Sequence, residues 1–412
     1  MTETNSSNAR DYDLVVCGAT GFTGRLVVEY LASTGAVGGS LRWAVAGRDR
    51  ERLERVVEEC VGTTPRPDVL VVDSLDDDAV NRLAASTAVV LTTIGPYARY
   101  GEPLLRACVE NGTHYCDLCG EVQWMRRMID SYQAAAAKSG ACIVLSCGFD
   151  SIPSDLGVQF LQETSQERHG AVCERIRLYV RALRGGASGG TFASMLNAIR
   201  EARADRNVAR VLGDPYALNP EGTRDGPDGR ELSDARFDDE VGEWTGPFVM
   251  AAVNTRVVRR SNALLGYPYG RDFRYGEVTL FGSGPGGWWR AKRTSWGLKL
   301  FVMCAAIELT RPLVVKRLPK PGEGPSAEQR EKGFFKLRLL GVTPDGDRVR
   351  VRVTGDRDPG YGSTSKMLAE SALCLVSNRD KLSGGLHTPA SALGAELRSR
   401  LVANAGLTFD AE

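Results

Sequence analysis

Histidine is rare in this chain of 412 residues: there are three, alongside ten cysteines. A zinc site needs closely spaced cysteine pairs or histidine partners. Cys116 and Cys119 form one such pair, but Cys142 and Cys147 are spaced differently, and Cys142 lies within a predicted strand. We therefore predict no metal site and expect these cysteines to be buried thiols. A redox pair at 116 and 119 is a less favoured alternative.

An excess of charge of one sign is also missing. The 52 Lys and Arg residues face 51 Asp and Glu residues, which leaves a net charge of +1. A groove that binds nucleic acid normally shows as a basic excess. The composition therefore predicts no nucleic-acid partner.

Long apolar runs are absent as well. The longest candidate, residues 296–307, is interrupted by Lys299 and falls short of the roughly 18–20 residues that span a bilayer. Residues 1–10 are polar and lack the apolar core of a secretory signal, so we predict a flexible tail there. These patterns favour a cytoplasmic protein with reduced cysteines. Peripheral contact with the inner membrane stays an open alternative.

The composition that is present, 42% hydrophobic and 25% charged residues, is ordinary for a globular chain long enough to form two domains. Up to residue 150, short apolar strands alternate with helices across short loops. The strands are expected at residues 14–17, 41–46, 68–73, 88–94, 114–117 and 141–146. This alternation predicts an α/β fold, a Rossmann-type doubly wound parallel sheet, in a dinucleotide-binding domain over residues 11–150.

The pattern changes after residue 150. A strand at 175–183, a helix at 191–204 and two alternating segments around residues 343–346 predict an inserted α+β substrate domain over residues 151–355, with an antiparallel or mixed sheet. Residues 213–245 are rich in Pro, Gly, Asp and Arg, which predicts a long exposed loop. A helix at 363–377 predicts that residues 356–412 return to the dinucleotide-binding domain.

Three glycines follow the first strand and open a helix, the context in which such a motif binds a dinucleotide. Gly18 permits the tight turn, Gly21 lets backbone N–H groups approach the pyrophosphate, and Gly24 brings helix and sheet close. A glycine turn without a ligand is the less favoured alternative. The predicted cofactor-binding residues are Gly18, Ala19, Thr20, Gly21, Phe22, Thr23, Gly24, Arg48, Asp73, Thr93, Gly95 and Pro96.

Arg48 indicates which dinucleotide is bound. NAD enzymes usually carry an acidic residue at the end of the second strand, where it holds the ribose hydroxyls. This chain has Arg48 there, and a guanidinium suits a 2′-phosphate. We therefore predict NADP, although Asp49 follows directly and leaves tolerance of NAD open, as does a merely solvated arginine.

The ends of the fourth and fifth strands supply the candidate catalytic residues, because the nicotinamide should lie at this edge of the sheet. Tyr97 follows Gly95 and Pro96 and is predicted to face the substrate, with simple packing equally compatible. Asp117 and Glu121 suit acid–base chemistry or ribose contacts, and helix capping fits them as well. Tyr97 and Asp117 are the predicted catalytic pair.

Three further segments have two or three interpretations each. The glycine-rich stretch 186–191 opens a helix and suits either an oxygen atom of the substrate or a plain turn. The basic cluster Arg256, Arg259 and Arg260 suits a phosphopantetheine phosphate, an acidic carrier-domain surface or, more simply, a solvated face. The aromatic and apolar stretch 288–307 suits a membrane interface, an acyl-chain pocket or a buried helix.

Several strings resemble one family, the saccharopine dehydrogenase-like oxidoreductases. They are Val15-Val-Cys-Gly-Ala-Thr-Gly-Phe-Thr-Gly24, Ala46-Gly-Arg48, Gly95-Pro-Tyr97, Tyr115-Cys-Asp-Leu-Cys-Gly-Glu121 and Gly148-Phe-Asp-Ser-Ile-Pro-Ser-Asp155. Residues 254–262 and 387–390 are similar to its enoyl reductase branch, the trans-acting enoyl reductases of mycobacterial polyketide-lipid synthesis. The resemblance runs from about residue 11 to the C-terminus.

The resemblance implies a split architecture and an NADP-dependent reductase. Its substrate would be an α,β-unsaturated acyl thioester on a carrier domain of a polyketide synthase, and a homodimer stays open. Hydride would go to the β-carbon, and a donor would stabilise the thioester oxygen before a proton reaches the α-carbon. Two alternatives remain: an amino-acid dehydrogenase like saccharopine reductase, and a non-catalytic NADP-binding protein of lipid surfaces.

Overall fold

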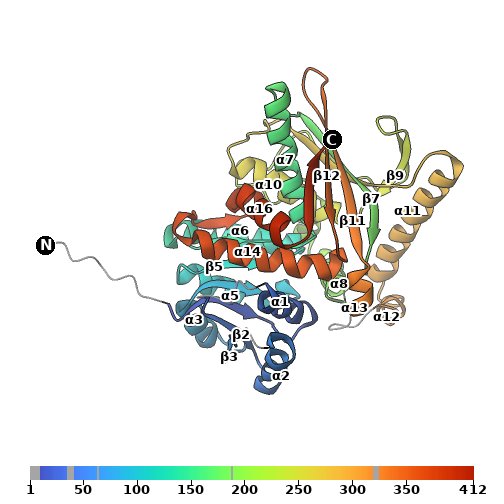
Figure 1. The fold of residues 1–412 in the computed structure, drawn as a ribbon. Coiled ribbons are helices and arrows are strands. Elements are labelled where there is room, and N and C mark those ends of the chain that lie inside the picture. Colours follow the sequence, from blue (N-terminus) through green and yellow to red (C-terminus); the bar gives the residue numbers. More distant parts are fainter. Residues whose placement is uncertain (1–9, 35–40, 63–64, 187–188, 319–323) are drawn as a thin grey trace.

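The first half of the fold is a parallel sheet of seven strands in the order β13-β6-β5-β4-β1-β2-β3 (Figure 1). The computed structural model describes residues 10–34, 41–62, 65–186, 189–318 and 324–412. Neighbouring strands all run parallel. The strands are β1 (Tyr12–Cys17), β2 (Trp43–Gly47), β3 (Asp68–Val71), β4 (Thr87–Thr92), β5 (His114–Asp117), β6 (Cys142–Val144) and β13 (Gly385–His387).

Both faces of this sheet are covered, because successive side chains of a strand point to opposite sides. In β1, Leu14 and Val16 join one buried apolar cluster, and Val15 and Cys17 join another. The first cluster includes side chains of α1 (Phe22–Ser33), α2 (Arg50–Val61) and α14 (Thr364–Asn378), and the second those of α3 (Asp77–Ser86), α5 (Glu102–Glu110) and α6 (Val122–Ser139). The predicted doubly wound α/β fold is confirmed.

The second sheet also has seven strands, in the order β14-β12-β11-β7-β10-β9-β8. The pair β7–β10 is parallel and the other pairs are antiparallel, so the sheet is mixed. Its strands are β7 (Arg175–Arg184), β8 (Arg236–Asp238), β9 (Glu243–Pro247), β10 (Arg274–Leu280), β11 (Phe334–Val342), β12 (Arg348–Gly355) and β14 (Leu407–Ala411).

Helices pack on one face of the second sheet and along its edge. Three helices cover the apolar face: α7 (Ile152–His169), α10 (Ala251–Leu264) and α16 (Gly394–Asn404). The helix α11 lies along β9 at the outer side of the molecule (Figure 1). The remaining elements are α4 (Tyr97–Tyr100), α8 (Gly189–Ala204), α9 (Arg206–Gly213), α11 (Gly284–Ala306), α12 (Arg311–Val315), α13 (Ala327–Glu331), α15 (Pro389–Ala392), the π-helical turn η1 (Pro359–Ser363) and the 3₁₀ turn η2 (Arg379–Lys381).

The C-terminal segment contributes to both sheets. The helix α14 contacts β4 and β5, and β13 extends the first sheet beyond β6. The prediction that all of residues 356–412 return to the first domain is wrong for β14, which pairs with β12 of the second sheet. In β14, the Phe409 ring meets the Phe160 ring of α7 edge-on, so α7 also packs on this strand of the second sheet.

Two local predictions also need correction. Residues 1–9 of the predicted tail lie outside the described residues, but the Arg10 guanidinium donates to the carbonyl oxygens of Ala84 and Asn111, at 3.1 and 2.7 Å. Side-chain hydrogen bonds therefore tie Arg10 to the first domain. The predicted loop 213–245 contains β8 and the start of β9, whose short length hid them from the sequence pattern. Among the described residues, no helix combines the length and apolarity needed to cross a bilayer.

Candidate active site

The glycine turn between β1 and α1 has the geometry of a dinucleotide cradle. Gly18 has a φ of +84°, and a Cβ atom there would lie 2.8 Å from Oγ1 of Thr93. A Cβ atom on Gly24 would overlap the carbonyl oxygen of Gly18, so only glycine lets α1 approach the turn. Gly21 is exposed, and a Cβ atom on it would meet nothing closer than 3.2 Å. The turn thus leaves its outer side open at Gly21.

The N-terminus of α1 presents free donors at the same place. The N-cap is Gly21, which has no side chain to accept a hydrogen bond from the first helical amides. The amides of Phe22 and Thr23 therefore face the turn without an intrahelical partner, as a pyrophosphate requires. Thr20 is exposed, and Ala19 is buried beneath the turn.

Phe22 offers only its backbone to this cradle. Its ring stacks edge-on against Tyr361 of η1, with the centroids 4.5 Å apart, and the Arg330 guanidinium lies 5.4 Å from the ring centroid. The side chain of Phe22 therefore joins the glycine turn to the second half of the fold.

Arg48 lies at the carboxyl end of β2 with its side chain exposed, and no other described residue hydrogen-bonds to it or pairs with it. Asp49 is already engaged: its carboxylate caps α2 by accepting from the Arg52 amide at 3.1 Å and pairs with the Arg52 guanidinium at 3.3 Å. Among the described residues the arginine is free to meet a 2′-phosphate, whereas the Asp49 carboxylate is already directed at Arg52. The residues present fit NADP.

The remaining predicted cofactor residues follow β3 and β4 at the same edge. Thr93 donates from Oγ1 to the carbonyl oxygen of Gly18 at 3.1 Å, which fixes the glycine turn against β4. Asp73 is exposed, and its carboxylate accepts from the Leu75 amide at 3.1 Å. Gly95 and Pro96 connect β4 to α4. A small hollow between the strand ends is lined by Cys17, Ala46, Gly47, Val72, Ser74, Val80, Ile94 and Leu104.

A larger cavity, of about 590 Å³, opens on the opposite edge of the first sheet. Asp13, at the amino end of β1, lines it together with Arg379 and Arg400. Ligands of open parallel sheets bind at the carboxyl ends of the strands. We therefore place the candidate cofactor site at the smaller hollow, because Cys17, Gly47 and Ile94 of its lining lie at the carboxyl ends of β1, β2 and β4.

Tyr97, one of the two predicted catalytic residues, is 4% exposed. Its hydroxyl donates to the carbonyl oxygen of Thr92 at 3.1 Å and accepts from the Leu118 amide at 3.4 Å. Burial and the nearby Asp117 raise its pKa well above the ordinary value of a tyrosine. These contacts fit the packing interpretation, because the hydroxyl is directed at the protein's own backbone.

Asp117, the other predicted catalytic residue, is fully buried and joins β5 to β6. Its carboxylate accepts from the amides of Cys119 and Ser146 and from the Tyr115 hydroxyl, each at 3.0 Å. Burial raises its pKa to about 7. A carboxylate that holds two strand ends together in this way has no free oxygen facing the edge, so the geometry favours a structural role.

Glu121 has the capping role that the sequence left open. Its carboxylate accepts from the Tyr97 amide at 2.8 Å and the Ala98 amide at 3.0 Å, the first two residues of α4. The Ser194 hydroxyl of α8 donates to the same carboxylate at 2.7 Å. Glu121 therefore ties α8 of the second half to the nicotinamide edge of the first.

The cysteines at this edge are buried. Cys116, Cys119, Cys142 and Cys147 are free thiols, 0–1% exposed. Burial raises the pKa of the Cys116 and Cys119 thiols well above the ordinary value. Within the described part of the chain, no group of three or more His, Cys, Asp and Glu side chains could hold a metal ion.

Asp150 was not among the predicted site residues, yet the structure brings it to the same edge. It follows β6, and its Oδ2 atom lies 3.7 Å from where a Cβ atom on Gly120 would stand, just past β5. The side chain is partly buried, and no described residue hydrogen-bonds to it. Burial raises its pKa to about 6. The string 148–155 was singled out only for its resemblance, which carried no role for the individual residue.

Its neighbours fix Asp150 in place. The Phe149 ring packs 4.9 Å from the Phe335 ring of β11, and the Phe149 amide donates to the Thr364 hydroxyl at 3.0 Å. On the other side, Ser151 precedes α7, and its hydroxyl lies 3.5 Å from the Asn254 amide oxygen of α10. Asp150 thus stands on a segment held by elements of both sheets.

The basic cluster of α10 faces inward, so the docking interpretations and the solvated face made from the sequence are wrong. Arg256, Arg259 and Arg260 are 2–4% exposed. Arg260 donates to the carbonyl oxygens of Leu218 and Leu386 at 2.5 and 2.6 Å. The physical reason is that the loop before β8 and the segment 384–386 bring backbone carbonyls over α10, and the arginines satisfy them.

The stretch 288–307 divides between two faces of α11. Phe301 lies toward α8, with its ring 6.1 Å from that of Phe192. Trp289, Leu300 and Met303 are 51–56% exposed. Ala187 and Ser188, within the glycine-rich stretch 186–191, lie outside the described residues.

Comparisons with known proteins agree with this geometry. Residues 14–144 match the family model described as the saccharopine dehydrogenase NADP binding domain. The chain is 41% identical to a Mycobacterium tuberculosis protein provisionally named a trans-acting enoyl reductase, over 97% of each chain. It is 38% identical to a Mycobacterium bovis trans-acting enoyl reductase, over 95% of this chain and 96% of the other.

Among solved structures, the fold resembles apo saccharopine dehydrogenase (L-Glu forming) from Saccharomyces cerevisiae. The TM-score is 0.51 at 12% identity, over 97% of this chain and 99% of the other. This likeness concerns the fold alone. The resemblance, the NADP cofactor and the oxidoreductase class predicted from the sequence are confirmed by these comparisons.

Proposed function

The chain belongs to the family of trans-acting enoyl reductases, and we propose that it reduces the α,β double bond of an acyl thioester with NADPH. In this proposal the thioester is carried by a polyketide synthase that makes lipids. The names of the relatives support the reaction class. The substrate and the pathway belong to the proposal.

The observation that carries the proposal is the carboxyl group of Asp150, to which no described residue donates a hydrogen bond. Of the other ionisable groups at this edge, Tyr97, Asp117 and Glu121 are each already hydrogen-bonded within the protein. Cys119 is a buried thiol whose pKa burial raises well above its ordinary value. Reduction of an enoyl thioester needs a proton donor at the α-carbon. Asp150 is the group of this set that is free to supply one.

NADPH, when bound, supplies the hydride that adds to the β-carbon. The glycine turn and the N-terminus of α1 bind its pyrophosphate, and Arg48 holds the 2′-phosphate. Asp150 then gives its proton to the α-carbon, becomes a carboxylate, and is protonated again from solvent. A pKa of about 6 keeps a usable protonated fraction near neutral pH.

A saccharopine-type amino-acid substrate fits this site less well. Such a substrate carries several carboxylates and needs converging cationic side chains. The three clustered arginines of α10 are buried and donate to the protein's own groups, as Arg259 does to Asp228 at 2.8 Å. These arginines therefore serve the protein's own carbonyl and carboxylate groups.

The test is NADPH oxidation with crotonyl- and longer enoyl-thioesters, by wild type and Asp150→Asn. We expect turnover by the wild type and a loss of about 10²-fold or more in kcat for the variant, with its NADPH affinity kept. Asp205→Asn, at the N-cap of α9, is the matched control, because asparagine still accepts from the Asn207 amide. Turnover by neither protein would refute enoyl reduction, and equal kcat values would refute the role of Asp150.

A further inference from the structure

The helix α11 packs on the protein through its smallest side chains. Gly287, Ala291 and Ser295 recur every four residues and are buried, and Ala305 is buried further along. This face lies against β9. A helix of an ordinary domain turns its bulky apolar side chains inward, so α11 is inverted.

Its bulky side chains form a stripe on the outer side. Trp289, Trp296, Leu300, Met303 and Ile307 are separated by 7, 4, 3 and 4 residues, the spacing of a single helical face. They are 43–56% exposed. The neighbouring ring Trp288 lies 6.0 Å from that of Trp289, and Trp289 lies 6.0 Å from Trp296.

The stripe is part of a larger exposed apolar surface. Of the 17 large apolar side chains exposed in the described part of the chain, ten lie between residues 288 and 315, within α11, α12 and their connection. Patches of this kind mark interaction sites, because scattered exposed apolar residues are the normal case.

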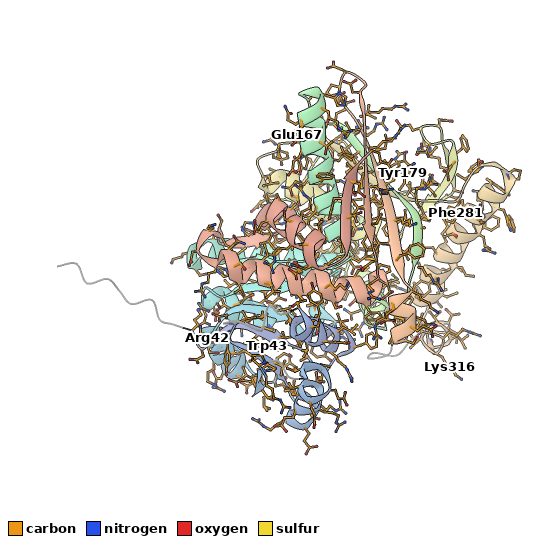
Figure 2. The ribbon with its side chains drawn as sticks, in the orientation of Figure 1. Arg42, Trp43, Glu167, Tyr179, Phe281 and Lys316 are labelled. Carbon is orange, nitrogen blue, oxygen red and sulfur yellow. The ribbon has the colours of Figure 1, made fainter. Side chains whose placement is uncertain are left out.

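The same segment is strongly basic. Between residues 290 and 317 there are seven Lys and Arg residues and one acidic residue, a local charge of +6 in a chain whose net charge is +1. Lys292 and Lys299 flank the stripe on one side, where both pair with Asp234 at 3.0 and 3.1 Å, and Arg293 flanks it on the other. Figure 2 places Lys316 at the outer edge of the molecule, past the end of α12.

We infer that α11 and α12 form a docking surface for a lipid bilayer with anionic headgroups. Aromatic and aliphatic side chains in a row, flanked by Lys and Arg, are the pattern of a helix lying in the membrane interface. Its tryptophans would sit at headgroup level, and its cations would meet the lipid phosphates.

Two other occupants fit less well. A second copy of this chain on a two-fold axis would bring one basic surface against another, which repels. An acyl substrate would need the stripe to face the active site, but the side of α11 that approaches α8 is the one with Phe301.

The experiment measures binding of the full-length protein to vesicles by cosedimentation. The vesicles are phosphatidylcholine alone or with about 30% phosphatidylglycerol, the anionic component being the source of the attraction. We expect binding to the anionic vesicles that weakens at high salt. The double variant Trp289→Ser/Met303→Ser should bind at least about tenfold more weakly. Val402→Ser, an equally exposed apolar side chain on α16, should bind like wild type.

A second measurement does not depend on a variant that folds. Brominated phospholipids in the anionic vesicles should quench part of the wild-type tryptophan fluorescence, because three of the six tryptophans lie in α11. Absence of vesicle binding or of quenching in the wild type would overturn the inference. Equal vesicle binding by the double variant and the wild type would also overturn it. So would a wild-type dimer that the double variant no longer forms. A double variant that binds vesicles like wild type but no longer turns over a soluble enoyl thioester would overturn it as well.

Discussion

Replacing Arg48 by alanine tests the cofactor assignment with little risk to the fold. The side chain is exposed and makes no hydrogen bond or ion pair with a described residue, so its removal breaks no contact of the folded chain. What is lost is the charged contact with the 2′-phosphate of NADPH.

The size of the effect follows from the chemistry of that contact. A hydrogen bond to a charged group contributes about 1.5–3 kcal/mol, which corresponds to roughly ten- to over a hundredfold in affinity. Arg48 is exposed, and water and salt screen such a contact. We therefore expect the lower end, a loss of about tenfold for NADPH and none for NADH, which has no 2′-phosphate.

The assay is titration of both cofactors into wild type, Arg48→Ala and the control Arg50→Ala by calorimetry. Arg50 is also exposed, but its guanidinium pairs with Glu54 at 3.5 Å in the first turn of α2. The control should bind NADPH like wild type. Equal NADPH affinities in wild type and Arg48→Ala would refute the assignment of Arg48 to the 2′-phosphate.

Four further outcomes are expected. Gly21→Val should abolish cofactor binding while keeping a cooperative melt, and tight NADPH binding by this variant would contradict the role of Gly21. Gly24→Ala should instead lower the melting temperature, because its Cβ overlaps the Gly18 carbonyl. The rate of proton transfer should fall as the pH rises through about 6, the raised pKa of Asp150. This fall with pH should be absent in Asp150→Asn. Because of the same raised pKa, the ionised Asp150 carboxyl group destabilises the fold above about pH 6, and this destabilisation disappears as the pH falls toward 4. Asp150→Asn should therefore be more stable than wild type at neutral pH, which urea titrations can check. Arg260→Met should cost about 3–5 kcal/mol of stability, because it leaves buried carbonyl groups without a hydrogen-bond donor. An unchanged melting temperature together with weaker binding of a carrier-bound substrate would restore the docking interpretation.

Much of the cofactor site could be predicted from the sequence. The glycine spacing, Arg48 and the alternation of strands with helices are local patterns, and each has a local physical cause. Gly18 needs a positive φ, Gly24 needs to lack a Cβ, and an apolar strand buried on both faces reads as a continuous hydrophobic run. Such features do not depend on what lies across the molecule.

The catalytic edge and the surfaces were decided by tertiary contacts. Asp117 ends β5 and Asp150 follows β6 of the same sheet, and their surroundings separate the two carboxyl groups. Asp117 accepts three hydrogen bonds, and Asp150 accepts none from the described residues. Arg260 is basic in a helix with other basic residues, yet distant backbone carbonyls bury it. The outward face of α11 was equally hidden, because the apolar spacing gives the stripe but not which side β9 covers. Which partner covers a side chain is a long-range property, so the sequence of the segment alone does not contain it.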